Sequence, residues 1–125
     1  MGAAYEGKIQ MGKLRSLVSV DESLSQASSR IRKLVHGGVD ITFSRLSLNE
    51  MDEMRLFEID IRSVLKQSPV TQLLGKSVAE GPAYRVEGQT TEGQGVAIRV
   101  RINMRKEQTP RLVIERVWRL KRSWP

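Results

Sequence analysis

Apolar residues recur along the chain with two different periods, one typical of helices and one typical of strands. Up to Gln67 they recur every three or four positions, as in the stripe Leu24, Ala27, Ile31, Leu34 and Val35. This spacing lines one side of a helix and buries it against a core. After Pro69 they recur at every second position, the pattern of a half-buried strand. The pattern therefore predicts helices first and a sheet second.

Three helices are predicted over about residues 20–67. The first follows a capping box at Ser19–Glu22, in which each side chain accepts a backbone N–H of the other residue, and it ends before Gly37. A second capping box, Ser47–Glu50, predicts the start of a short helix. The third helix runs from about Glu58 to Gln67 and ends just before Pro69. Between the first two, Val39–Phe43 alternates and predicts a short strand or an extended entry.

Four strands are predicted over about residues 70–120, with Gly88–Gly95 as a glycine-rich hairpin connection. They are Val70–Leu74, Ala83–Glu87, Val96–Met104 and Leu112–Leu120. Helices followed by strands imply an α+β fold, with the helices packed on one face of a curved four-stranded antiparallel sheet. We expect an N-terminal arm over residues 1–18 and a single domain over residues 19–125. Trp118 has apolar parity in the last strand and is predicted to lie in the core.

Composition adds a charge asymmetry to this picture. The net charge is +7, and residues 97–125 hold nine basic and two acidic residues, an excess equal to that of the whole chain. Such clustering is typical of surfaces that bind nucleic-acid phosphates. The chain has one histidine and no cysteine, so disulfides, thiolate zinc sites and a cysteine nucleophile are excluded, and we expect no metal and no cofactor. No apolar run reaches the roughly 18 residues of a membrane span, and no signal-peptide pattern occurs, so we expect no membrane contact and a cytoplasmic location.

Arginines on the predicted sheet are the main candidates for binding. Arg99 and Arg101 point the same way from one strand, about 7 Å apart. The further candidates for nucleic-acid binding, from neighbouring strands and the tail, are Arg85, Arg119, Lys121 and Arg122. The alternative is a solvated face on which Arg99 and Arg101 form cross-strand ion pairs with Glu115.

Arg116 breaks the alternation, because it falls on the apolar parity of its strand. An arginine in that position indicates either a β-bulge that redirects its side chain or a side chain that reaches a functional cleft.

The middle and the end of the chain together match a known motif pattern. The matching segments are Phe43-Ser44-Arg45-Leu46-Ser47-Leu48-Asn49-Glu50-Met51, Asp60–Leu65, Tyr84-Arg85-Val86-Glu87-Gly88 with Gly93, and Val113–Trp118. Over about residues 41–120 the chain resembles a domain-of-unknown-function family of the barnase–EndoU–colicin–RelE (BECR) toxin-like group. Members of that family carry F-S-x-H-A-x-x-R-M, a helix ending in V-L, and Y-R-V-x-G-x-x-x-x-G.

This resemblance implies a ribonuclease-like toxin fold of the RelE kind, often paired with an antitoxin. Metal-independent RNA cleavage in such a fold needs a cation cluster and an acid or base. The candidates here are Arg116 for charge stabilisation and Tyr84 or Glu87 for proton transfer, with Glu115 nearby. The chain departs from the family at the motif histidine and the two motif arginines, which fall on Leu46, Glu50 and Met54.

Two functions are therefore expected from the sequence. The first is a toxin-like protein that binds RNA through its phosphates, either as a divergent ribonuclease or as one that has lost activity, with an acidic antitoxin as a possible partner. The second is a non-catalytic interaction module of a phage or mobile element, whose basic sheet face binds an acidic protein.

Overall fold

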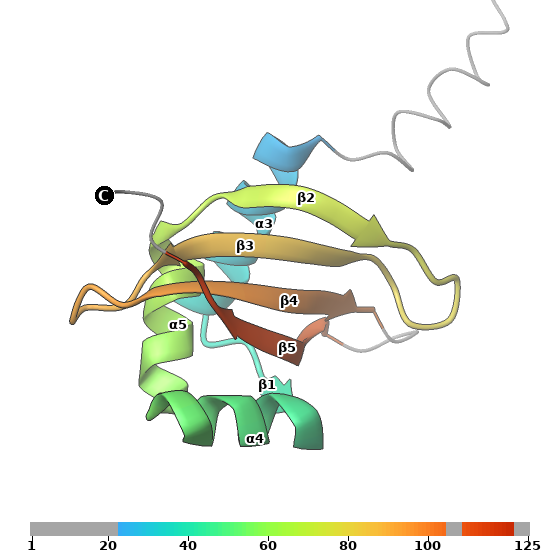
Figure 1. Ribbon diagram of the computed structural model, residues 1–125. Helices are drawn as coiled ribbons and strands as arrows, with labels where there is room; N and C mark the ends of the chain where they lie inside the picture. The colour runs from blue at the N-terminus through green and yellow to red at the C-terminus, as the bar shows by residue number, and fades with distance from the viewer. Residues whose placement is uncertain (1–22, 105–108, 122–125) are drawn as a thin grey trace, which may run out of the picture.

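The helices of the computed structural model lie close to where the apolar spacing predicts them (Figure 1). The structure describes residues 23–104 and 109–121, so the predicted arm, the Ser19–Glu22 capping box and Arg122 lie outside the described residues. Helix α3 spans Leu24–His36. It begins with a capping box in which Gln26 N donates to Ser23 Oγ (3.1 Å) and Ser23 N donates to Gln26 Oε1 (3.0 Å).

Helix α4 spans Arg45–Met54 and begins two residues before the predicted capping box. Its N-cap is Ser44, whose Oγ accepts Ser47 N at 3.0 Å. Ser47 is fully buried inside the first turn and donates its hydroxyl to Ser44 O (2.8 Å). The predicted capping box at Ser47–Glu50 is therefore wrong, because Ser44 already satisfies the N-terminal amide and leaves Glu50 free for another partner.

Helix α5 spans Glu58–Gln67, as predicted. Phe57 N donates to Asp60 Oδ2 at its start (2.7 Å), and Pro69 follows its end. Ile61, Val64 and Leu65 form its buried side.

The described strands form one sheet of mixed direction, with the order β1-β5-β4-β3-β2. They are β1 (Ile41–Phe43), β2 (Val70–Gly75), β3 (Ala83–Gln89), β4 (Gly95–Asn103) and β5 (Arg111–Arg119). Strands β2 to β5 are the four predicted ones, and each pairs antiparallel with its neighbour in sequence.

The expectation of a four-stranded, purely antiparallel sheet is wrong at one edge, where β1 is a fifth strand parallel to β5. Leu112 N donates to Asp40 O (3.0 Å) and Ser44 N donates to Ile114 O (2.9 Å), which fixes β1 in place. Parallel pairing needs a long crossover between the two strands, and here that connection includes α4, α5 and the other three strands. The alternation of three residues does not reveal so distant a partner.

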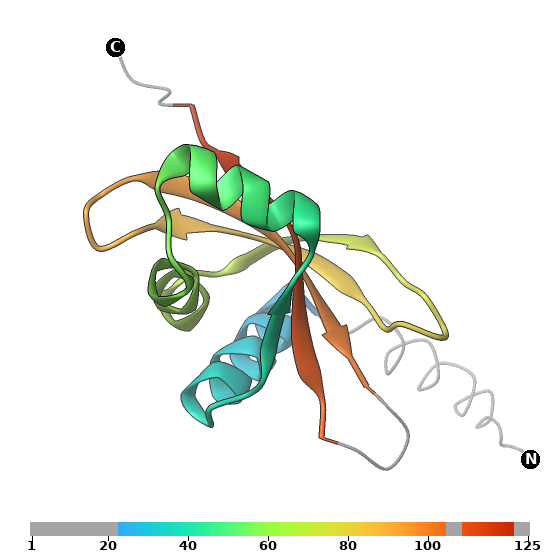
Figure 2. The ribbon, with the colours of Figure 1, turned by 90° about the horizontal axis from the view of Figure 1, so that it is seen from below.

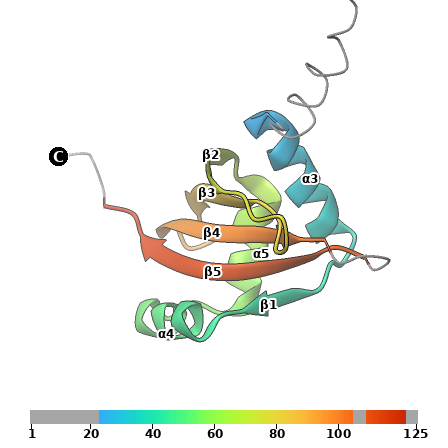
Figure 3. The ribbon, with the colours of Figure 1, turned by 90° about the vertical axis from the view of Figure 1, so that its right-hand side faces the viewer.

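Helices α3 and α5 pack together on one face of the sheet, with α3 against β2 and α5 against β3 (Figures 1 and 2). The core between these layers is built from β-branched and leucine side chains, among them Ile31, Ile61, Leu65, Ile98 and Ile114, each at most 1% exposed. Helix α4 lies apart from this pair, beside β5 (Figure 3). None of the described helices is long and apolar enough to cross a membrane.

Candidate functional site

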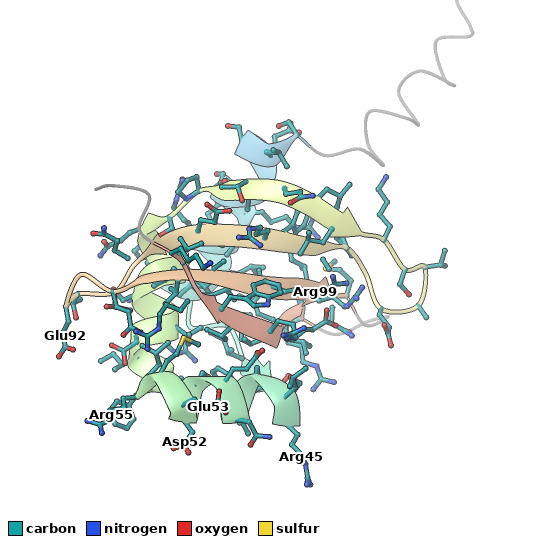
Figure 4. The ribbon with its side chains drawn as sticks, viewed as in Figure 1. Arg45, Asp52, Glu53, Arg55, Glu92 and Arg99 are labelled. Atoms are coloured by element: carbon teal, nitrogen blue, oxygen red, sulfur yellow. The ribbon has the colours of Figure 1, made fainter. Side chains whose placement is uncertain are left out.

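The face of the sheet that points away from α3 and α5 carries the predicted arginines. Core residues Val96, Ile98, Val100 and Ile102 of β4 alternate with residues of the opposite face. We call that opposite side the open face: α3 and α5 leave it uncovered, and α4 borders it only along β5. It is turned toward the viewer in Figure 4, where Arg99 is labelled on it.

A β-bulge in β5 decides which residues of that strand reach the open face. Arg99 is paired with Arg116, but the next residue, Val100, is paired with Ile114, so Glu115 is an extra residue. A bulge reverses the parity of all later residues in its strand. The bulge predicted as one explanation of Arg116 is thus confirmed, and it redirects this side chain to the open face.

The same bulge corrects the prediction that Trp118 lies in the core. Val117 takes the inward position and is 1% exposed, while Trp118 is paired with Ala97 and lies half-buried on the open face. The position of Trp118 could have been predicted from the break in alternation at Arg116, since a bulge before Arg116 places Trp118 on the same face as Arg116.

Three arginines from three neighbouring strands form a row across the open face. Arg85 of β3 is paired with Arg99 of β4, which is paired in turn with Arg116 of β5. We call these three residues the arginine row. Like charges placed directly opposite each other in a sheet are destabilising unless other groups neutralise them. The row therefore needs nearby carboxylates.

Glutamates supply that neutralisation. Glu115 accepts two hydrogen bonds, one from Arg99 Nε to its Oε1 and one from Arg101 Nε to its Oε2, both at 2.7 Å. Glu87 accepts Arg85 Nε at 2.6 Å. Glu50 of α4 accepts Nε and Nη2 of Arg116 at 2.9 and 2.7 Å. The cross-strand ion pairs considered as the alternative to phosphate binding are thus present.

This balance changes how the charge of the C-terminal quarter is distributed. Four guanidinium groups of the open face meet three carboxylates, and Glu80 lies 4.0 Å from Arg101 as a fourth. Glu50 and Glu87 belong to the part of the chain that is neutral as a whole. These four guanidinium groups are therefore largely neutralised although the strands that carry them are basic in sequence.

The ion pairs leave donors available on two members of the row. Arg85 and Arg99 are each held through Nε alone, and within the described part of the chain their Nη1 and Nη2 atoms donate no hydrogen bond. Their side chains are 28% and 31% exposed. A guanidinium fixed through Nε presents its two terminal nitrogens in a set direction, the arrangement that suits a phosphate or carboxylate ligand.

Trp118 lies next to the row. Ala97, its partner in β4, carries only a methyl group, so the indole can reach across β4. The Cζ atoms of Arg85 and Arg116 lie 5.3 and 5.1 Å from the ring centroid, within cation–π range. The open face thus combines an aromatic ring with oriented guanidinium groups.

The edge of β5 beyond β1 is occupied by side chains of the α4 segment. Ser44 Oγ donates to Glu115 O (3.0 Å), and Glu50 Oε1 accepts Val117 N (2.8 Å). Figure 3 shows β1 and α4 following each other along this edge. Glu50 therefore satisfies a strand amide and binds Arg116 with the same carboxylate. The hydrogen bonds that Arg116 donates to Glu50 also raise the pKa of its guanidinium.

The other predicted site residues are not all brought together. Tyr84 is 3% exposed and belongs to the core cluster on the helix side, so it is separated from the arginine row. Glu87 lies on the open face and also accepts a hydrogen bond from the Thr71 hydroxyl at 3.4 Å. Arg119 is paired with the inward-facing Val96 at the end of β5 and is exposed there, and Lys121 is exposed beyond the strand.

Replacing Glu115 by glutamine should reduce the pH dependence of stability. Burial raises the pKa of Glu115, but hydrogen bonds and charges from Arg101 and Arg99 outweigh this and hold it below the ordinary value of 4.5. A carboxyl group whose pKa is lowered by folding stabilises the protein above its unfolded-state pKa, and this contribution is lost as the pH falls through its folded-state value. The difference in urea midpoint between wild type and Glu115→Gln should therefore be constant above about pH 5 and shrink below it.

Glu53→Gln, at an exposed position of α4, is the control for the change in net charge. A difference between wild type and Glu115→Gln that grows on acidification would contradict the assignment.

Among the described residues, no three histidine, cysteine, aspartate or glutamate side chains lie together in a way that could hold a metal ion. Compared with protein-family models, with curated proteins and with solved structures, the chain gives no significant match.

Proposed function

We propose that this protein binds RNA through the open face of its sheet. The observation that carries the proposal is the pair Arg85 and Arg99, which lie opposite each other and are each fixed through Nε with both terminal nitrogens available. Two guanidinium groups with their terminal nitrogens available can donate hydrogen bonds to the oxygens of one phosphate or of two consecutive phosphates. The described residues outside the open face include further cations, so that long-range attraction adds to these local contacts.

Binding is better supported than cleavage. Neither residue proposed for proton transfer is well placed to act on RNA at the open face. Tyr84 is buried on the helix side of the sheet, and Glu87 already accepts hydrogen bonds from Arg85 and Thr71. Glu50 stands where the resembled family has a motif arginine, and its carboxylate already accepts hydrogen bonds from Arg116 and from the Val117 amide. A relationship to the BECR group remains part of the proposal, and the antiparallel run β2 to β5 behind the N-terminal helices supports it.

The test is RNA binding by a protein that lacks the available donors. Arg85→Gln with Arg99→Gln should weaken binding of bulk RNA about tenfold at about 50 mM salt and lower the slope of log affinity against log salt by about two. Fluorescence anisotropy of labelled RNA over a salt series measures both quantities.

The matched control is Arg45→Gln with Lys66→Gln, which removes the same charge from exposed positions of α4 and α5. Equal losses in the two double variants would sink the proposal, because they would show that only net charge matters.

A second candidate is binding of an acidic protein, as in an antitoxin or a mobile-element partner. The ion pairs of the open face favour it, since four of its arginines already bind carboxylates, namely Arg85, Arg99, Arg101 and Arg116. An acidic polypeptide such as polyglutamate, used as a competitor in the same assay, separates the two. Displacement of RNA only at a large excess of carboxylate favours RNA as the ligand.

A further inference from the structure

The position of Trp118 bears on which form of RNA the open face would hold. The indole is half-buried, belongs to the residue paired with Ala97, and has two guanidinium groups within 5.3 Å of its centroid. Aromatic rings set among cations are typical of proteins that bind single strands, in which bases stack on the rings while the cations hold the phosphates. In a duplex the bases stack on each other and their faces are not available.

We propose that the ligand is a single-stranded RNA segment, with one base at Trp118 and the adjoining phosphate at the Nη atoms of Arg85 and Arg99. This inference rests on the proposed function and specifies its substrate. Arg85 links the two parts of the site, because its guanidinium both contacts the ring and lies opposite Arg99.

The dimensions of the sheet agree with this arrangement. Neighbouring strands lie about 4.8 Å apart, so the arginine row spans about 10 Å from β3 to β5. Trp118 is two residues beyond Arg116 on the same face of β5, about 7 Å along the strand. A base and its own phosphate can therefore be reached from the same part of the open face.

The experiment compares strand forms in a protein whose tryptophan fluorescence reports on this site alone. The chain has two tryptophans, so Trp124→Phe leaves Trp118 as the reporter. Single-stranded RNA of about ten nucleotides and a duplex of the same sequence are titrated at low salt. We expect the single strand to bind and quench the fluorescence, and the duplex to bind about tenfold more weakly with little quenching.

Variants at Trp118 test the stacking contact itself. Trp118→Leu keeps an apolar side chain opposite Ala97 but removes most of the stacking surface, and should weaken single-strand binding about tenfold. Trp118→Phe should recover most of the loss. Thermal melting establishes that both variants are folded, and the comparison of strand forms in the Trp124→Phe protein does not depend on either of them.

The outcomes separate the two proposals. Duplex and single strand bound equally well, with both lost in Arg85→Gln with Arg99→Gln, would overturn the single-strand inference and leave RNA binding standing. Full single-strand affinity in a folded Trp118→Leu protein would overturn it in the same way. Failure of both RNA forms to bind at low salt would overturn both proposals.

Discussion

Replacing Gly81 by alanine should lower the free energy of unfolding by about 3 kcal/mol. Gly81 has a φ of 90°, and an added Cβ would overlap the backbone carbonyl of Ile102. A left-handed conformation costs an L-residue roughly 1–2 kcal/mol, and forcing atoms into a packed site costs a further 1–3 kcal/mol, roughly. Because the obstacle is backbone of the central strand β4, it cannot be relieved by a side-chain rotation. Thermal or urea denaturation measures the loss, expected as a fall in Tm of about 10 °C.

Alanine substitutions at two other glycines separate the cost of the left-handed backbone conformation from the cost of the overlap with Ile102. Gly93 has a φ of 86° but no atom within 4 Å of its added Cβ, so Gly93→Ala carries the conformational cost alone, about 1 kcal/mol. Gly75 has neither a positive φ nor a close neighbour, and Gly75→Ala should be nearly neutral. Equal effects at Gly81 and Gly93 would show that the contact with Ile102 relaxes at little cost.

The position of Gly81 also ties the turn before β3 to the open face. Its N–H donates to Ser77 O at 2.7 Å, and its carbonyl accepts Nη1 of Arg101 at 2.7 Å. A displaced Gly81 would therefore move Arg101 as well, whose side chain is only 11% exposed. We expect Gly81→Ala to weaken RNA binding even under conditions in which the protein is still folded.

Replacing Glu50 by alanine should cost about 2 kcal/mol of stability. The larger part comes from Val117 N, which loses its acceptor at the edge of β5, since an unsatisfied buried donor costs about 1–3 kcal/mol. The ion pair with Arg116 contributes less, because the Arg116 side chain is 38% exposed and solvent screens its charge. The urea midpoint of the purified protein measures the change.

Glu50→Gln distinguishes the two contributions. Its amide oxygen can still accept Val117 N, so most of the stability should be kept although the negative charge is lost. Glu53→Ala, on an exposed position of α4 in Figure 4, controls for the loss of a helical glutamate. If Glu50→Gln and Glu50→Ala were equally destabilised, the ion pair and not the strand amide would be the main contribution.

The elements that the sequence predicts well are those set by local repetition. Helix α5 agrees with its predicted bounds because its apolar spacing, its acidic first turn and Pro69 all act within a few residues. Strands β3 and β4 are likewise found where alternation places them. The predicted start of α4 is wrong because two serines compete for one cap, and Ser44 is favoured by a distant partner, the carbonyl of Glu115.

The candidate site was only partly accessible from the sequence. Alternation alone places Arg85, Arg99 and Arg101 on one face, and the sheet has them there. The mutual alignment of Arg85, Arg99 and Arg116 depends on the pairing register of three strands and on a bulge, neither of which a single strand encodes. The sequence does not indicate Glu50 as a partner of Arg116, since the two residues are 66 positions apart and meet only because α4 lies beside β5.

By itself, the sequence determined the class of this protein, the order of helices and strands, and which strands are basic, because hydrophobic periodicity and charge are local properties. The tertiary structure alone decided that β1 pairs parallel to β5, that Trp118 faces outward and that glutamates neutralise much of the basic face. These outcomes depend on contacts between residues far apart in the chain. A one-residue bulge at Glu115 is enough to reverse the faces of the residues after it, and its energetic preference comes from partners on other elements.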